Sequence, residues 1–196
     1  KTNLETLLHD AIGHVRDRDD GARILDLATG HGRYVLDAIK AYPSSDVSAR
    51  LRDFSDINVA AGSALAREMG LDNVVYEQAN AFDRAAIADV PDKPNICIVS
   101  GLYELFPEND PIRQSLAGLA DATKPGAYLI YTNQPWHPQL EFIARVLKSH
   151  RDGDDWVMRR RTQQEMDQLV GEAGFRKIRQ LIDADGIFSV SIAQRV

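Results

Sequence analysis

The segment from Arg23 to Val35 holds the residues best suited to binding a small molecule. An apolar run ends in Asp26, small residues including Gly30 and Gly32 follow, and an amphipathic stretch comes next. This order predicts a strand, a tight loop and a helix, with a carboxylate where the strand ends. Glycine adopts backbone conformations closed to other residues and lets a ligand approach the main chain. Since open α/β sheets bind ligands at this edge, the segment predicts a ligand site, and a purely structural turn is the alternative.

A second acidic residue, Asp53, ends the next expected strand, over residues 47–52. An acidic side chain at this place accepts hydrogen bonds from ribose hydroxyls in dinucleotide-binding folds. The alternative for Asp53 is a helix cap or a surface charge. Phe54 follows it and is expected to pack either on an adenine ring or on the neighbouring helix.

Polar and aromatic residues also follow the third expected strand, over residues 74–78. The amide of Asn80 can donate to and accept from the edge of an adenine. Phe82, two residues on, can cover the face of the same ring, with Ala81 between them. A turn with a buried phenylalanine is the alternative.

The residues after the fourth expected strand, over 95–100, lie where a reacting group would meet the sheet edge. Tyr103 is expected to orient an acceptor, and Glu104 to take a proton or to bind a cation. The alternative is a loop leading into a helix, with a buried aromatic side chain.

His137 stands in a proline-flanked stretch after the fifth expected strand, beside Trp136. Imidazole titrates near neutral pH, so His137 is a candidate general base, although an isolated histidine is more often not catalytic. Three adjacent arginines, Arg159, Arg160 and Arg161, either form a solvated surface or recognise a carboxylate or phosphate on an acceptor, because arginine binds such groups through two hydrogen bonds.

The elements that would position these residues alternate along the chain. Apolar residues at helical spacing from Leu4 to Val15 predict an N-terminal helix. Five strands then alternate with helices, and residues 175–193 indicate a terminal hairpin. This pattern predicts an α/β fold with a mostly parallel sheet and one antiparallel strand.

The composition of the chain excludes several classes of function. The chain has 196 residues, 44% of them hydrophobic, as expected for one globular domain with a substantial core. Its net charge of -6 disfavours an extended nucleic-acid surface. No run is long enough to span a membrane, and no spacing of His, Cys, Asp and Glu suggests a metal site. The single cysteine, Cys97, suits a reducing compartment, so a cytoplasmic location is expected.

The pattern Asp26-x-Ala28-x-Gly30-x-Gly32, with the acidic and amide residues that end the next two strands, resembles the class I S-adenosylmethionine (SAM) dependent methyltransferases. The resemblance implies a Rossmann-like sheet of seven strands, the last antiparallel, with helices on both faces. It implies SAM as cofactor, S-adenosylhomocysteine (SAH) as product, and a SAM-binding domain over residues 21–196. Residues 1–20 would form an N-terminal helix that is part of an acceptor-side lid.

The resemblance also assigns roles to the cofactor residues. The methionine part of SAM would lie against Asp26, Ala28, Gly30 and Gly32, the ribose against Asp53, and the adenine against Asn80, Ala81 and Phe82. Phe54 and Ser100 complete the expected cofactor-binding set. Two residues depart from the family pattern: Ala28 replaces a common glycine, and Asn80 replaces a common aspartate.

Three segments, 30–35, 51–55 and 81–83, resemble a bacterial sub-family often fused to an α/β-hydrolase domain, so a fused hydrolase domain is an expected partner. The expected function is methyl transfer from SAM to a small-molecule acceptor held in line with the methyl group, with Tyr103 and His137 as catalytic candidates. A non-catalytic SAM- or nucleoside-binding module that regulates a fused partner is the alternative. The glycine spacing disfavours a third class, nicotinamide-dependent oxidoreductases.

Overall fold

Seven strands form one sheet in the order β3-β2-β1-β4-β5-β7-β6 in the computed structural model, which describes residues 2–18, 21–148 and 159–196. Neighbouring strands from β3 to β5 pair in parallel, and β7 pairs antiparallel with both β5 and β6. The expected seven-stranded sheet with a reversed last strand is therefore confirmed. The strands are β1 (Ala22–Leu27), β2 (Val47–Asp53), β3 (Val74–Gln78), β4 (Ile96–Val99), β5 (Tyr128–Asn133), β6 (Phe175–Ile182) and β7 (Ser189–Arg195).

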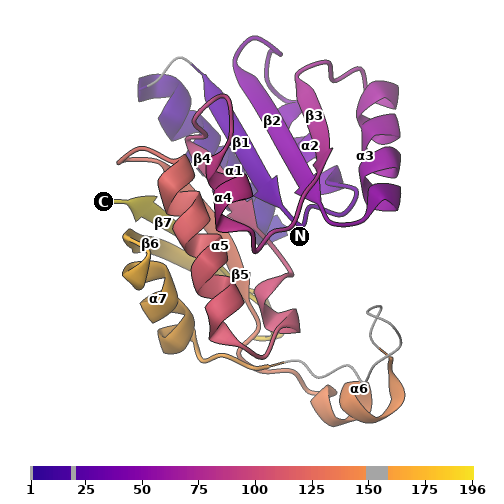
Figure 1. The fold of residues 1–196 in the computed structure, drawn as a ribbon, viewed down its shortest axis with the longest axis vertical. Coiled ribbons are helices and arrows are strands. Elements are labelled where there is room, and N and C mark those ends of the chain that lie inside the picture. Colours follow the sequence, from indigo (N-terminus) through magenta and orange to yellow (C-terminus); the bar gives the residue numbers. More distant parts are fainter. Residues whose placement is uncertain (1, 19–20, 149–158) are drawn as a thin grey trace.

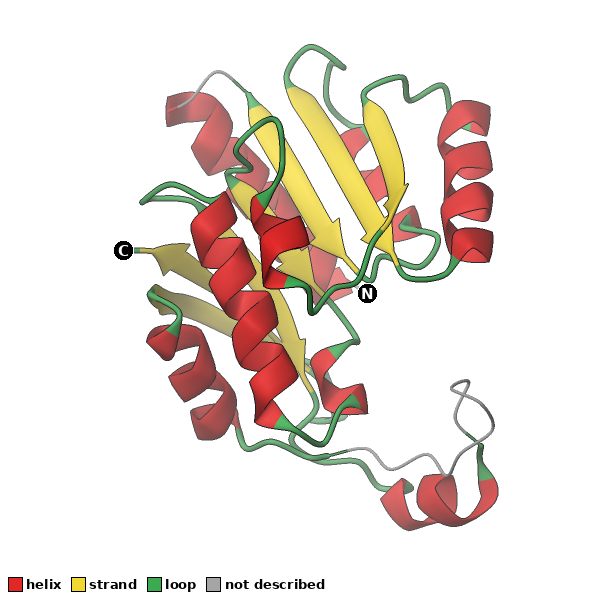
Figure 2. Ribbon diagram, in the orientation of Figure 1, coloured by secondary structure: helices red, strands yellow, loops and turns green. Residues whose placement is uncertain are grey.

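Helices cover both faces of this sheet (Figures 1 and 2). The central strand β4 is accordingly apolar along its length, and each of its residues is buried. One face packs against α1 (Thr2–Arg18), α2 (Arg33–Ile39) and α3 (Asp56–Glu68), and the other against α4 (Arg84–Ala88), α5 (Asn109–Ala122) and α7 (Gln163–Glu172). The sheet thus separates two apolar layers.

The predicted N-terminal helix is α1, and its apolar stripe is buried from Leu4 to Val15. These side chains pack with those of α2 and of the central strands, so α1 belongs to the same core as the rest of the chain. The predicted segment 1–20 includes Lys1 and residues 19–20, which lie outside the described residues.

Two short elements lie at the carboxyl edge of the sheet. The 3-10 helix η1 (Tyr103–Leu105) follows β4, and α6 (Leu140–Val146) follows β5. No residue of α6 is buried, and the helix extends away from the sheet in Figure 1. Among the described residues, no helix is both long and apolar enough to cross a membrane.

Candidate functional site

The loop between β1 and α2 has a left-handed backbone at three positions. The φ angles are 56° at Ala28, 59° at Gly30 and 62° at Gly32. A Cβ atom on Gly32 would lie 2.9 Å from Leu51 Cδ1, Thr29 Oγ1 and Tyr76 Oη, whereas a Cβ on Gly30 would have no neighbour within 4 Å. Gly32 is therefore required by close packing, and Gly30 borders open space that a ligand can use.

Tyr76 supports this loop from β3. Its hydroxyl donates to the main-chain oxygen of His31 at 2.9 Å. The tyrosine ring lies over Gly62 of α3, where an added Cβ would approach a ring carbon to 2.2 Å. The glycine in α3 thus makes room for the side chain that fixes the loop, a role that the sequence alone did not indicate.

Asp26, at the carboxyl end of β1, is fully buried and only partly satisfied. Its Oδ2 accepts hydrogen bonds from Thr29 Oγ1 and from the Tyr34 hydroxyl, each at 2.6 Å. Its Oδ1 is buried and has no hydrogen-bond partner among the described residues. Burial raises the pKa of Asp26 from 3.8 to about 7 against the lowering effect of the two hydroxyls, and nearby Asp53 adds to the rise. A cationic ligand group at Oδ1 would satisfy this oxygen and stabilise its charge.

Asp53, at the end of β2, connects two loops. Its Oδ2 accepts a hydrogen bond from the Gly30 main-chain N–H at 2.8 Å. Its Oδ1 accepts from Ser55 N at 2.9 Å and from Asn58 Nδ2 at 3.0 Å. The cap of α3 is Ser55, so the alternative role of Asp53 as a helix cap is wrong. A carboxylate has about four acceptor positions, so Asp53 retains capacity for a ligand hydroxyl.

The expected adenine residues lie at the ends of β2 and β3. Asn80 Oδ1 accepts from Phe82 N at 3.0 Å, which closes a turn and leaves the Asn80 side chain exposed. Ala81 is buried, and the Phe82 ring meets Phe106 edge-on at 4.5 Å between centroids. Phe54 is 74% exposed, so its ring packs on neither a helix nor the core.

A cavity of about 470 Å³ opens beside the β1 loop. It brings together α1, the loop and the end of β4, and its lining residues are Leu4, Thr29, His31, Gly32, Arg33, Tyr34 and Ser100. Leu4 at the amino end of α1 therefore borders the space next to the candidate cofactor residues. A second cavity, of about 530 Å³ and lined by Arg18, Arg23, Lys93 and Lys124, lies at the opposite edge of the sheet, away from these residues.

Tyr103 does not face this space. It is 2% exposed, and its hydroxyl makes a 2.9 Å hydrogen bond to Ser115 Oγ of α5, inside the core. Burial raises the pKa of the Tyr103 hydroxyl well above its usual range. The expectation that Tyr103 orients an acceptor is therefore wrong, because its hydroxyl is used in packing α5 onto the sheet.

His137 lies on the loop that leads to α6. Its Nδ1 accepts a hydrogen bond from Gln139 N at 3.1 Å, a contact within the same loop. Trp136 beside it is 53% exposed. The structure does not bring His137 to the β1 loop, so its role as a base remains a prediction.

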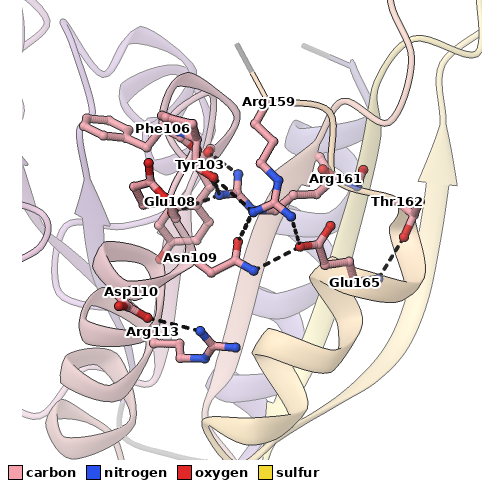
Figure 3. Close-up of polar contacts among 12 residues, drawn as sticks. Tyr103, Phe106, Glu108, Asn109, Asp110, Arg113, Arg159, Arg161, Thr162 and Glu165 are labelled. Atoms are coloured by element: carbon pink, nitrogen blue, oxygen red, sulfur yellow. Dashed lines mark hydrogen bonds and ion pairs between the residues drawn. The ribbon is translucent and has the colours of Figure 1, made fainter. Parts of the chain in front are cut away.

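The three arginines have separate surroundings. Arg161 is 1% exposed and donates to the main-chain oxygens of Tyr103 at 2.8 Å, Phe106 at 2.8 Å and Glu108 at 3.0 Å (Figure 3). Arg159 forms an ion pair with Glu165 at 2.5 Å. Arg160 donates to the side-chain oxygen of Gln134. A solvated arginine surface is therefore wrong for Arg161, which acts as a buried clamp on the residues after β4.

The described residues contain no group of three or more His, Cys, Asp or Glu side chains placed to hold a metal ion. The site consists instead of a strained small-residue loop, two carboxylates at strand ends and an adjoining cavity. This arrangement can bind a small molecule that carries a cation and hydroxyl groups.

Comparison with known proteins gives a consistent result. The family model described as "Putative methyltransferase" matches residues 1–195. A curated relative, the uncharacterized protein YnbC of Escherichia coli strain K12, is 51% identical over 197 residues, which cover 100% of this chain and 33% of that protein. The chain thus spans about a third of the length of this relative.

Solved structures show the same fold. A SAM-dependent methyltransferase from Methanosarcina mazei has a TM-score of 0.69 at 18% identity, and the match covers 97% of each chain. Magnesium protoporphyrin IX methyltransferase from Synechocystis PCC 6803, solved with bound SAH, has a TM-score of 0.71 at 15% identity, covering 99% of this chain and 83% of that one.

Proposed function

The chain belongs to this methyltransferase family, and we propose that it transfers the methyl group of SAM to a small-molecule acceptor. One observation carries the proposal. The Asp26 carboxylate is buried next to a left-handed loop, with one oxygen that no described residue satisfies. A buried, unsatisfied carboxylate oxygen is costly, and a ligand ammonium group would remove that cost.

The residues at the sheet edge fit SAM part by part. Asp26 Oδ1 would accept a hydrogen bond from the α-ammonium group, beside the open space at Gly30. Asp53 would accept from ribose hydroxyls while it holds the Gly30 amide. The adenine would lie near Asn80 and Phe82, and the exposed ring of Phe54 offers a further apolar surface.

When bound, SAM supplies a methyl group that is electrophilic because it is attached to a sulfonium. The residues of the chain then need to hold an acceptor atom in line with that methyl group and to exclude water. Leu4, Tyr34 and Ser100 line the cavity beside the loop and would form one wall of the acceptor site. Arg159 and Arg161 donate to groups of the protein itself, which disfavours them as binders of an anionic acceptor.

Calorimetric titration with SAM, SAH and NAD tests this function. We expect micromolar binding of SAM and SAH and no binding of NAD. Binding of NAD without SAM or SAH would indicate an oxidoreductase instead. No binding of SAM or SAH to the folded chain would remove the basis of the proposal.

A regulatory module is the second candidate, since this chain corresponds to only 33% of the curated relative. In that case the chain would bind SAM without turnover and would change the activity of a fused domain, for which an α/β-hydrolase is the proposed partner. Single-turnover detection of SAH with a broad panel of acceptors separates the candidates: product formation favours the enzyme. SAM binding that alters the activity of the longer protein, with no SAH formed, favours the module.

A further inference from the structure

Glu104 is a buried carboxylate that the sites described above do not use. It lies in η1, directly after β4, and is 5% exposed. Its Oε2 is buried and accepts no hydrogen bond from any described residue. Burial raises the pKa of Glu104, while its own main-chain N–H and the charges of Arg160 and Arg161 oppose the rise. Buried polar atoms in native proteins nearly always have a hydrogen-bond partner, so Oε2 is a candidate to bind a ligand, an ion or an ordered water.

Its place in the fold is after the carboxyl end of β4, at the sheet edge that also carries the β1 loop. Tyr103, one residue earlier, directs its side chain to Ser115 of α5. Arg160, whose charge acts on Glu104, is bound to Gln134, directly after β5. Glu104 therefore belongs to the region where the carboxyl ends of β4 and β5 meet, at the same sheet edge as Ser100, which lines the cavity beside the β1 loop.

The segment that carries Glu104 is held firmly. The Arg161 guanidinium bonds to main-chain oxygens on both sides of Glu104, at Tyr103 and Phe106, each at 2.8 Å. Figure 3 shows this guanidinium between the end of η1 and the start of α7. An unsatisfied carboxylate oxygen in this well-held segment lowers the stability of the fold. Functional sites often carry such a cost in stability.

We propose that Glu104 is the acceptor-side base. Its Oε2 accepts a hydrogen bond from the O–H or N–H of the acceptor atom that receives the methyl group. This inference rests on the proposed SAM-dependent methyl transfer and names the acceptor class, a molecule that carries a proton on its nucleophilic oxygen or nitrogen.

The proton and electron changes balance. A bond forms between the acceptor oxygen or nitrogen and the methyl carbon as the carbon–sulfur bond breaks, and that electron pair stays on sulfur. The Glu104 carboxylate takes the proton that the acceptor loses and later releases it to water. A general base is most effective when its pKa suits the proton that it takes, and burial raises the pKa of Glu104 above its usual value.

The test uses sinefungin, a SAM analogue in which an amine-bearing carbon replaces the methyl sulfonium. Its amine reaches toward the acceptor side, so a carboxylate there strengthens its binding relative to SAH. We expect the wild-type protein to bind sinefungin about tenfold more tightly than SAH. Glu104→Gln is expected to abolish this preference and to leave the SAH affinity unchanged. The matched control is Glu108→Gln, an exposed glutamate of the same segment, which should behave as wild type.

Several results would overturn the proposal for Glu104 alone. One is wild-type protein that binds SAH but does not prefer sinefungin. Another is a Glu104→Gln variant that keeps the preference. The third is a Glu104→Gln variant that loses SAH binding as its melting temperature falls, because that result would show that Glu104 has a structural role. Glu104→Ala, measured in the same way, replaces the glutamine variant if that one does not fold. Wild-type protein that binds neither SAH nor sinefungin would instead contradict the proposed function itself.

Discussion

The Gly30 main-chain N–H donates to Asp53 Oδ2 at 2.8 Å, so the loop after β1 and the end of β2 are one unit. The loop that would hold the methionine part of SAM is thereby fixed by the residue that would bind its ribose. Asp53 Oδ1 in turn holds Ser55 and Asn58 at the start of α3. A change at Asp53 therefore acts on both the ligand contact and the shape of the loop.

Replacing Asp53 by alanine should weaken SAM binding by about 1–3 kcal/mol, the typical cost of losing a buried polar pairing. The variant would lose both the contact with the ribose and the hydrogen bond from the Gly30 main-chain N–H. Titration calorimetry with SAH measures the change, and Asp56→Ala, at an exposed position three residues on, is the control. An unchanged affinity in Asp53→Ala would show that Asp53 is not the ribose ligand.

A valine at position 30 should block cofactor entry while the domain stays folded. Its side chain would extend into the open space that now borders Gly30. The matched control is Gly186→Val in the β6–β7 hairpin, because Gly186 has a similar φ of 69° and equally open surroundings. Both variants should lose similar amounts of thermal stability, and only Gly30→Val should lose SAH binding. Normal SAH binding by Gly30→Val would contradict the placement of this loop.

Asp26→Asn should change how stability depends on pH. The folded-state pKa of Asp26 is raised from 3.8 to about 7, so the folded protein holds this proton more tightly than the unfolded chain. The stability that the protonated form contributes is fully present below pH 4 and is lost as the pH rises to 7. The free energy of unfolding of Asp26→Asn should therefore rise relative to that of wild type as the pH increases over this range, by on the order of 4 kcal/mol at most.

Urea unfolding of the ligand-free protein between pH 4 and pH 8 measures this difference. Asn at position 26 keeps an acceptor for the Thr29 and Tyr34 hydroxyls, so the comparison isolates the charge. Asp56→Asn, at an exposed site, serves as the control. A stability difference between wild type and Asp26→Asn that stays constant with pH would contradict the raised pKa.

Arg161→Met should destabilise the fold by on the order of 3 kcal/mol, because buried main-chain oxygens at Tyr103, Phe106 and Glu108 would lose a charged donor. Chemical denaturation gives the free energy of unfolding for comparison. The control is Arg113→Met on α5, which is exposed and should have little effect. If Arg161→Met and Arg113→Met have the same free energy of unfolding, Arg161 does not hold η1 in place.

Local sequence signals sufficed for the sheet and for the first ligand loop. Apolar runs such as Ile96–Val99 are typical of central strands that are buried on both faces, and the spacing of its leucines predicted α1. The residues that end β1 and β2 meet because parallel strands bring their carboxyl ends to one edge. Short elements were missed: α4 has five residues and η1 has three, too few to show a period.

The sequence by itself determined the seven-stranded fold and the position of Asp26, Gly30 and Asp53 at one edge, because these depend on patterns within each strand and loop. Only the tertiary structure decided which of the neighbours Tyr103 and Glu104, both of them buried, has a hydrogen-bond partner for its side chain. A 3-10 turn gives no periodic signal for this difference, which depends on partners distant in the chain. Ser115 of α5 holds the Tyr103 hydroxyl, and Arg161, 58 residues away, holds its main-chain oxygen. Side-chain contacts of that separation form only when the chain has packed, so no local pattern encodes them.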